Sequence, residues 1–233
     1  LASGSDADFV NNGTFIINRS DAVTIFQDIS GSGNLVQQGS GTTTLTGTNT
    51  HTGTTTINDG TLVAGSAGAL TNSRIVIADA ANAKLQLITF DSTIDRLSGG
   101  GSSGGTVDLG ARTLRVGRDN QSTTFAGVIE GTGTLVKQGT GTFTLSGPST
   151  FSGGTTAEAG ILQAGVSSTE SPSFTDGAFG VGGVTVNSGA GLDLNGFTVA
   201  NNLTLAGTGP DVLGDGSELT GALFNSAAGT ATV

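Results

Sequence analysis

The chain of 233 residues contains no Cys, Met, Trp or Tyr, and it has only three Pro and one His. Without Cys there can be no disulfide, so an extracellular form of the chain would depend on stacked strands for its stability. Trp and Tyr are the usual stacking platforms for sugars and bases, and their absence disfavours ligands held in that way. No run of 18 apolar residues occurs, which argues against a membrane-spanning helix.

Basic residues are also scarce. Eight Lys and Arg stand against 18 Asp and Glu, which leaves a net charge of −10 and a pI near 4.2. Such a chain repels phosphate backbones, so nucleic acid is excluded as a partner. The same charge disfavours docking on anionic lipid and favours a well-solvated surface.

What the chain does contain is Gly, at 41 positions, and short stretches in which Thr, Val, Leu and Ile alternate with polar residues. Alternation of this kind between Gly-rich turns is typical of short β-strands. No apolar stripe of helical period is sustained beyond two turns. The sequence therefore predicts an all-β fold.

An internal repeat organises the chain. Residues 31–65 read GSGNLVQQGSGTTTLTGTNTHTGTTTINDGTLVAG, and residues 131–165 read GTGTLVKQGTGTFTLSGPSTFSGGTTAEAGILQAG, with 19 of 35 positions identical and no gap. Weaker echoes occur at residues 105–117 and 189–199, and short strand-like segments at 74–78, 84–88 and 203–206. Nearly the whole chain is thus predicted to consist of strands of about four to six residues.

The two copies indicate which side chains face inward. Apolar positions are kept, and they are Leu35, Leu45, Leu62 and Ala64, with Leu135, Leu145, Leu162 and Ala164. Other positions exchange freely, and we expect these to face outward: Gln37 for Lys137, Thr46 for Ser146, Asn58 for Glu158 and Val63 for Gln163. Side chains alternate between the two faces of a strand, so one buried face explains both sets.

Three strands of ~5 residues with three short turns form a coil of roughly 20–25 residues. The offset of 100 residues would then be four or five whole coils, which would return the second copy to the same face. The sequence thus predicts a right-handed, single-stranded parallel β-helix of roughly ten coils, with three short strands per coil. We expect residues 1–233 to form one continuous segment of it.

The repeat resembles the passenger-associated transport repeat of autotransporters, the passengers of type V secretion. Both copies carry G-x-G-x-L-x-[KQ]-x-G-x-G-T-x-T-L-[ST]-G and a closing G-x-L-x-x-G. Thr54 and Pro148 are small departures from the family pattern. The resemblance implies a secreted or surface-displayed β-helix of a Gram-negative bacterium. It also implies a C-terminal outer-membrane β-barrel in the full-length protein. The chain begins at Leu1 without a leader, so we expect a processed product.

Catalytic chemistry has few candidates. His51 is the only His, and its counterpart in the second copy is Phe151, so we interpret it as a turn or surface residue that packs its ring. Residues 214–217 read Gly-Asp-Gly-Ser but lack the context of a serine protease. Asp108 and Asp193 match in the echoes Val-Asp-Leu and Leu-Asp-Leu and could form a hydrolase pair. We expect both to be outward residues on solvated strands.

The other charged residues are scattered. Further carboxylates are at Asp91, Asp95, Asp211, Asp215 and Glu218, and the last three lack the spacing of a calcium loop. Arg112, Arg115 and Arg118 form one basic cluster, in which Arg112 and Arg115 are expected on different faces. We therefore predict no catalytic, cofactor-binding or metal-binding residue, and no enzymatic activity.

These features favour a structural scaffold for adhesion, autoaggregation or biofilm formation. The expected partners are a host or bacterial cell surface, or other copies of the chain through coil edges. Neither end of the sequence carries an evident cap, so a self-assembling extracellular fibre subunit is an alternative. A β-helical hydrolase acting on polysaccharide is a third.

Overall fold

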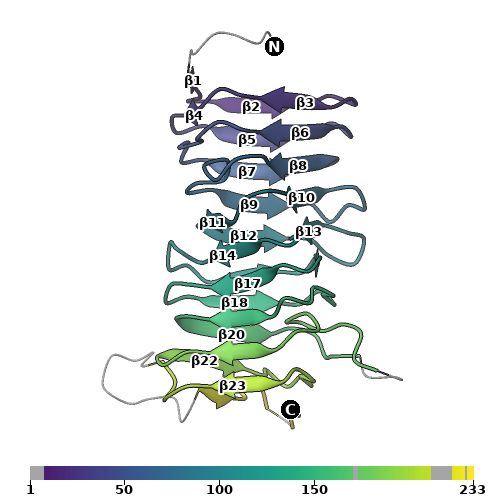
Figure 1. The fold of residues 1–233 in the computed structure, drawn as a ribbon, viewed down its shortest axis with the longest axis vertical. Helices are drawn as coiled ribbons and strands as arrows, with labels where there is room; N and C mark the ends of the chain where they lie inside the picture. Colours follow the sequence, from purple (N-terminus) through teal and green to yellow (C-terminus); the bar gives the residue numbers. More distant parts are fainter. Residues whose placement is uncertain (1–7, 170–172, 211–221, 229) are drawn as a thin grey trace.

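The computed structural model of the chain describes residues 8–169, 173–210, 222–228 and 230–233. Within these residues all regular elements are β-strands, and the named strands pair in parallel. The chain winds from one end of the stack to the other, so that sequence order becomes vertical order (Figure 1). The described residues include no helix that is long and apolar enough to cross a membrane.

Three sheets run along the stack. The long sheet has ten strands, one from each coil. Its strands are β2 (Thr14–Ile17), β5 (Asn34–Gln37), β7 (Thr54–Ile57), β9 (Arg74–Ile77), β12 (Arg96–Gly99), β15 (Thr123–Phe125), β18 (Thr142–Leu145), β20 (Gly160–Ala164), β22 (Ala190–Asp193) and β24 (Leu223–Phe224).

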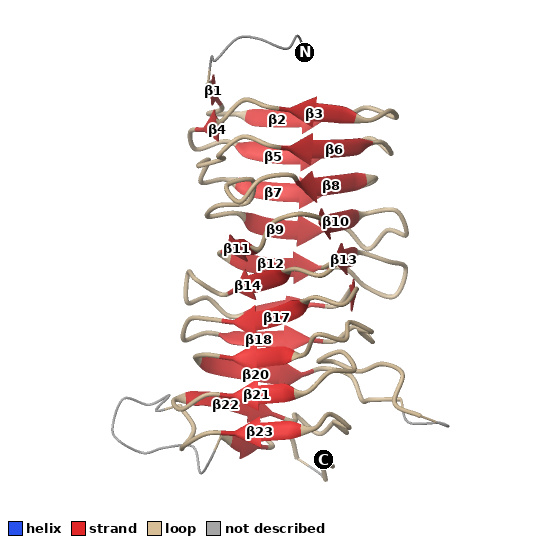
Figure 2. Ribbon diagram, in the orientation of Figure 1, coloured by secondary structure: helices blue, strands red, loops and turns tan. Residues whose placement is uncertain are grey.

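Two sheets of six strands form the other sides. The upper sheet comprises β3 (Val23–Ile25), β6 (Thr42–Leu45), β8 (Thr61–Ala64), β10 (Lys84–Leu87), β13 (Thr106–Asp108) and β16 (Val128–Glu130). The lower sheet comprises β11 (Ser92–Ile94), β14 (Thr113–Val116), β17 (Thr134–Lys137), β19 (Thr155–Ala157), β21 (Val184–Val186) and β23 (Leu203–Leu205). A two-stranded sheet joins β1 (Phe9–Val10) to β4 (Ile29–Ser30). The predicted all-β solenoid with three short strands per coil is confirmed (Figure 2).

The core is a set of vertical columns of inward side chains. One column runs through Ile25, Leu45, Ala64 and Leu87, which are direct partners on neighbouring strands. All eight apolar positions that the two copies keep are at most 1% exposed, as the sequence predicted. A single coil cannot bury such residues alone, and each neighbouring coil covers the layer above or below it.

The second copy does not return to the face of the first, and the prediction of four or five whole coils is wrong. β5 of the first copy lies in the long sheet, whereas its counterpart β17 lies in the lower sheet. β6 lies in the upper sheet, and its counterpart β18 lies in the long sheet. The cause is uneven coil length, because Thr14 pairs with Asn34 after 20 residues, whereas Gly99 pairs with Phe125 after 26. Each strand of the second copy therefore lies in a different sheet from its counterpart in the first copy.

The predicted outward set is also partly wrong. Thr46, Ser146, Asn58 and Glu158 are partly exposed as expected, but Gln37 and Lys137 are each only 1% exposed and point into the coil. Val63 lies in the outward column between Thr44 and Gln86, yet only 3% of it is exposed. Gln37 and Lys137 thus exchange because both place a polar group at the same buried position, and not because the position faces solvent.

Candidate functional site

Lys137 is buried without a carboxylate partner among the described residues. Its Nζ donates hydrogen bonds to the backbone oxygens of Gln138 (2.6 Å), Gly139 (2.8 Å) and Ala159 (3.1 Å). Burial lowers the pKa of this amine to about 8. The counterpart Gln37 donates from Nε2 to two backbone oxygens of its own turn in the same way. The position therefore closes the turn of each repeat from inside.

His51 is fully buried. The expectation that its ring is packed is therefore right, whereas the expectation of a surface position is wrong. Its Nε2 lies 3.0 Å from the hydroxyl of Thr55, whereas its Nδ1 is buried and has no hydrogen-bond partner among the described residues. Burial also lowers the pKa of the imidazole. Phe151 occupies the same inward position in the second copy and is likewise fully buried. The imidazole ring packs in the core, and the phenyl ring of Phe151 can therefore replace it.

Asp108 and Asp193 are not brought together. Asp108 ends β13 in the upper sheet and is partly exposed, whereas Asp193 ends β22 in the long sheet and is 2% exposed. The expectation that both face solvent is therefore wrong for Asp193. Each accepts a hydrogen bond from the backbone two residues further on, Gly110 and Asn195. The two echoes thus share a turn and do not form a catalytic pair.

The remaining charged candidates shape turns or form ion pairs. Asp91 accepts a hydrogen bond from the backbone of Thr113, and Asp95 pairs with Arg118 at 3.2 Å. Arg115 pairs with Glu158 at 2.8 Å, while Arg112 reaches a backbone oxygen. Asp211, Asp215, Glu218 and residues 214–217 lie outside the described residues. No cluster of three or more metal-binding side chains occurs in the described part of the chain.

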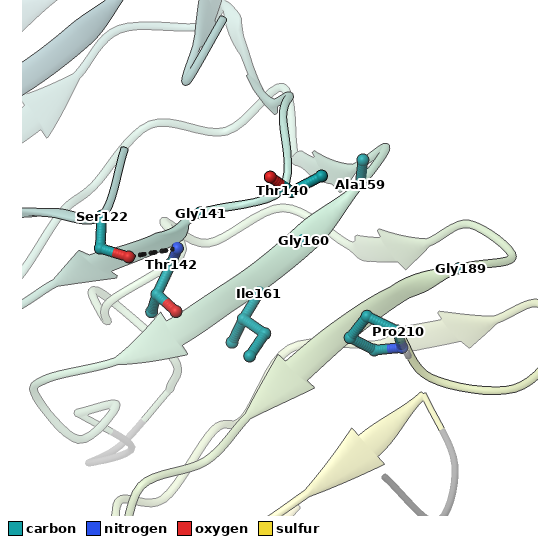
Figure 3. A pocket seen from close by; sticks show the side chains of 9 residues that line it. All are labelled: Ser122, Thr140, Gly141, Thr142, Ala159, Gly160, Ile161, Gly189 and Pro210. Carbon is teal, nitrogen blue, oxygen red and sulfur yellow. Dashed lines mark hydrogen bonds between the residues drawn. The ribbon is translucent and has the colours of Figure 1, made fainter. Parts of the chain in front are cut away.

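A hollow that sequence reasoning missed lies on the outer side of the long sheet (Figure 3). It has a volume of about 540 Å³, and its lining includes Ser122, Thr140, Thr142, Gly160, Ile161, Gly189 and Pro210. A second hollow of about 440 Å³ is lined by Ser122, Thr123, Thr124, Thr142, Thr144 and Gln163. Because the hollows share Ser122 and Thr142, they form one depression, here named the outer groove. It crosses β15, β18 and β20.

The floor of the outer groove is fixed by a chain of side-chain hydrogen bonds. Thr144 donates to Gln163 Oε1 at 2.7 Å, and Gln163 Nε2 donates to Asp193 at 2.7 Å. Ser226 donates to the same carboxylate. Burial alone would raise the pKa of Asp193, but hydrogen bonds from Ser226, Gln163 and Asn195 outweigh burial and lower it. The carboxylate therefore stays ionised, and its hydrogen bonds hold Gln163 in one orientation.

Other polar groups of the outer groove are left free. The hydroxyl of Ser122 accepts a hydrogen bond from the backbone of Thr142 at 3.0 Å, which fastens the upper wall. The hydroxyls of Thr124, Thr140 and Thr142 have no hydrogen-bond partner among the described residues. Ile161 provides partly exposed apolar surface beside them. The lining segments span residues 122–210, and no sequence pattern signals that they meet.

Comparison with known proteins relates the chain to a family of repeats and to an adhesin. The passenger-associated transport repeat family matches residues 35–64 and 135–164. The chain is also similar to the adhesin BmaC autotransporter of Brucella suis biovar 1 (strain 1330). The two are 32% identical over 256 aligned positions, which cover 91% of this chain and 8% of the adhesin. No solved structure matches the chain.

The matched residues fall within the two copies of the internal repeat. Both copies place their kept leucines in the core and tie the same turn from inside, through Gln37 and Lys137. The adhesin aligns with nearly the whole chain, including the segments between the repeats. The chain therefore carries two passenger-associated transport repeats, and nearly its whole length is similar to a segment of an autotransporter adhesin.

Proposed function

We propose that this chain is a structural segment of a surface-displayed passenger rod that mediates adhesion and has no enzymatic activity of its own. The observation that carries the proposal is the 32% identity to a protein named as an adhesin, across 91% of this chain. The chain corresponds to only 8% of that adhesin, so adhesion by this segment itself is the point that needs a test.

The architecture suits contact better than catalysis. Paired parallel strands hold their outer side chains in fixed columns, as in Thr156, Thr185 and the rest of the lower sheet. Columns of this kind offer many weak contacts over a long surface, and their avidity grows when several engage together. The candidates for acid-base chemistry lie apart, with Asp108 and Asp193 on different sheets and His51 buried in the core.

The proposal includes the route and the setting. A longer parent protein would export this segment across the outer membrane of a Gram-negative bacterium through a C-terminal β-barrel, as autotransporters do. Residues 1–233 would form one continuous part of its β-helix. The partner would be a host or bacterial cell surface, and the strong negative charge of the chain favours a partner that is not itself polyanionic.

Surface display tests the proposal directly. The chain would be fused to a heterologous autotransporter barrel in a non-adherent Gram-negative strain, with an epitope tag to measure display. We expect several-fold more cells bound to epithelial monolayers than for a strain that displays the tagged barrel alone. Equal binding at equal display would show that this segment is not adhesive.

A further inference from the structure

We propose that the outer groove is a binding site for a neutral, hydroxyl-rich oligosaccharide. This inference rests on the proposed adhesive function and names the chemistry that one face of the rod would recognise. The groove is the place where two hollows of about 540 and 440 Å³ join. Ligand sites commonly have volumes of roughly 300–1,000 Å³.

The free hydroxyl groups are the first reason. Thr124, Thr140 and Thr142 border the groove, and their hydroxyls make no hydrogen bond within the described chain. A hydroxyl can donate one hydrogen bond and accept others, and so can each hydroxyl of a sugar. Several such groups can therefore bind several sugar hydroxyls, because either partner can act as the donor or the acceptor at each position.

The absence of charge at the groove is the second reason. Its described lining residues are Ser, Thr, Gly, Ala, Ile, Pro and Gln, although the chain as a whole carries a net charge of −10. The nearest carboxylate in its hydrogen-bond chain, Asp193, is 2% exposed and already bound by Gln163 and Ser226. Nothing in this lining offers a cation to sulfate, sialate or phosphate, so an anionic glycan would find no partner and would meet the negative field of the protein.

The shape of the groove is the third reason. Its strands already pair on both sides, β18 with β15 and β20, so no free backbone edge is present to accept an extended peptide. Ile161 provides a small apolar surface against which the C–H face of a sugar ring can pack. Without Trp or Tyr each contact is weak, which suits a rod that engages through many copies on a cell.

The first repeat provides a built-in control. Thr42 and Thr142 are equivalent positions, each on the outer side of its strand, but Thr42 lies in the upper sheet. Its register partner there is Thr61 in place of Ile161, and the next outward residue of the strand, Thr44, pairs with Val63 where Thr144 pairs with Gln163. A substitution at Thr42 therefore reproduces the local change without touching the outer groove.

Beads coated with the purified chain would be tested on an array of oligosaccharides. Maltotetraose, mannotetraose and chitotetraose are the neutral probes, and sialyllactose and a heparin tetrasaccharide are the anionic ones. We expect binding to at least one neutral probe, at least tenfold weaker binding for Thr142→Gln, and a change of less than twofold for Thr42→Gln. Thr142→Val, which removes the hydroxyl but adds no bulk, should weaken binding by a smaller factor. Circular dichroism would verify that the variants fold alike.

Three outcomes would overturn the inference. They are no binding to any neutral probe, preferential binding to the anionic probes, or equal effects of Thr142→Gln and Thr42→Gln. The adhesion assay separates this inference from the proposed function. If displayed cells adhere and Thr142→Gln leaves adhesion unchanged, the groove is not the site while the adhesive function stands. If the array shows groove-dependent binding but displayed cells do not adhere, the adhesive function fails by itself.

Discussion

The hydroxyl of Thr43 donates a 2.7 Å hydrogen bond to Oε1 of Gln37 inside the first repeat. Both side chains are 1% exposed, and the carboxamide also holds the turn through the backbone oxygen of Gly39 at 2.7 Å. In the second repeat Phe143 replaces Thr43 and Lys137 replaces Gln37. A Lys needs no donor, so the loss of the hydroxyl leaves nothing unpaired there.

Removal of the Thr43 hydroxyl should therefore destabilise the first repeat. Thr43→Val leaves the Oε1 of Gln37 buried without a donor, and we expect the free energy of unfolding to fall by about 1–3 kcal/mol. Urea unfolding followed by circular dichroism measures the change. Thr44→Val is the matched control, because Thr44 is adjacent but faces outward, and it should change stability by less than about 0.5 kcal/mol. Equal losses in both variants would contradict the role of the bond.

The buried amine of Lys137 should make stability rise at alkaline pH. Its pKa of about 8 in the folded chain lies below the ordinary value of 10.5, so between these values the unfolded chain binds more protons than the folded one. Stability therefore increases as pH rises from 8 to 10.5, by at most about 3 kcal/mol. Without Tyr or Cys, few other groups titrate in this range.

Thermal or urea unfolding at pH 7.5, 9 and 10.5 checks this expectation. Lys137→Met should abolish the rise, because the methionine side chain has no proton to lose. Lys84→Met is the control, since Lys84 lies on the outer side of the upper sheet beside Glu130. A rise that persists in Lys137→Met would assign the effect to another group.

His51 should have a consequence of the same sign in a lower pH range, because burial lowers its pKa as well. Burial lowers its pKa in the folded chain, so the unfolded chain binds the extra proton first as the pH falls through about 6.5. The stability contributed by the neutral ring is present at pH 7 and lost toward pH 5. The protonated ring would also place a donor on Nδ1, for which the described part of the chain offers no acceptor.

His51→Phe, which introduces the residue found at position 151, should remove that acid sensitivity. The measurement is the difference between the melting temperatures at pH 7 and pH 5, which is expected to be smaller in the variant. A change in packing or the loss of the bond to Thr55 affects the melting temperature at both pH values. Comparing the pH 7 minus pH 5 difference between the wild type and the variant therefore removes these contributions. An unchanged difference would show that His51 is not the titrating group.

Two glycines at equivalent turns should tolerate no side chain. Gly60 and Gly160 have φ values of +67° and +65°, and a Cβ on Gly60 would collide with the backbone oxygens of Gly39 and Gly41. Gly60→Ala and Gly160→Ala should each cost at least about 1–3 kcal/mol, because strain and the clash add. Gly13→Ala is the control, because a Cβ there would meet nothing within 4 Å. Similar stability of all three variants would contradict this account.

The sequence predicted the architecture well, and the reason is physical. Positions such as Leu35 and Leu135 keep their apolar side chains because each coil must bury the same column. It misplaced Gln37 and Lys137, because their exchange looks like that of surface residues when the backbone oxygens around them are not visible. It also missed the phase of the second repeat, since the 26 residues between Gly99 and Phe125 include a loop whose path no pattern fixes.

The outer groove could not be predicted at all. Its walls combine Ser122, Thr142 and Pro210, and these meet only because coils of different length stack in one order. The short polar residues that form it are the same types that fill ordinary turns and outer strand faces elsewhere in the chain. Only the hollow itself, which exists once these residues meet in space, distinguishes the place.

The shift of the second copy to different sheets also determines which side chains a partner meets along the outside of the rod. A flat partner that lies along the long sheet meets the first and third strands of the first copy, β5 and β7. Further along the same sheet it meets the second and fourth strands of the second copy, β18 and β20. Two related sequences, identical at 19 of 35 positions, thus give two different surfaces on a single side of the rod. Because the coils differ in length, the two copies present different strands on the long sheet, while their kept leucines and alanines stay in the core.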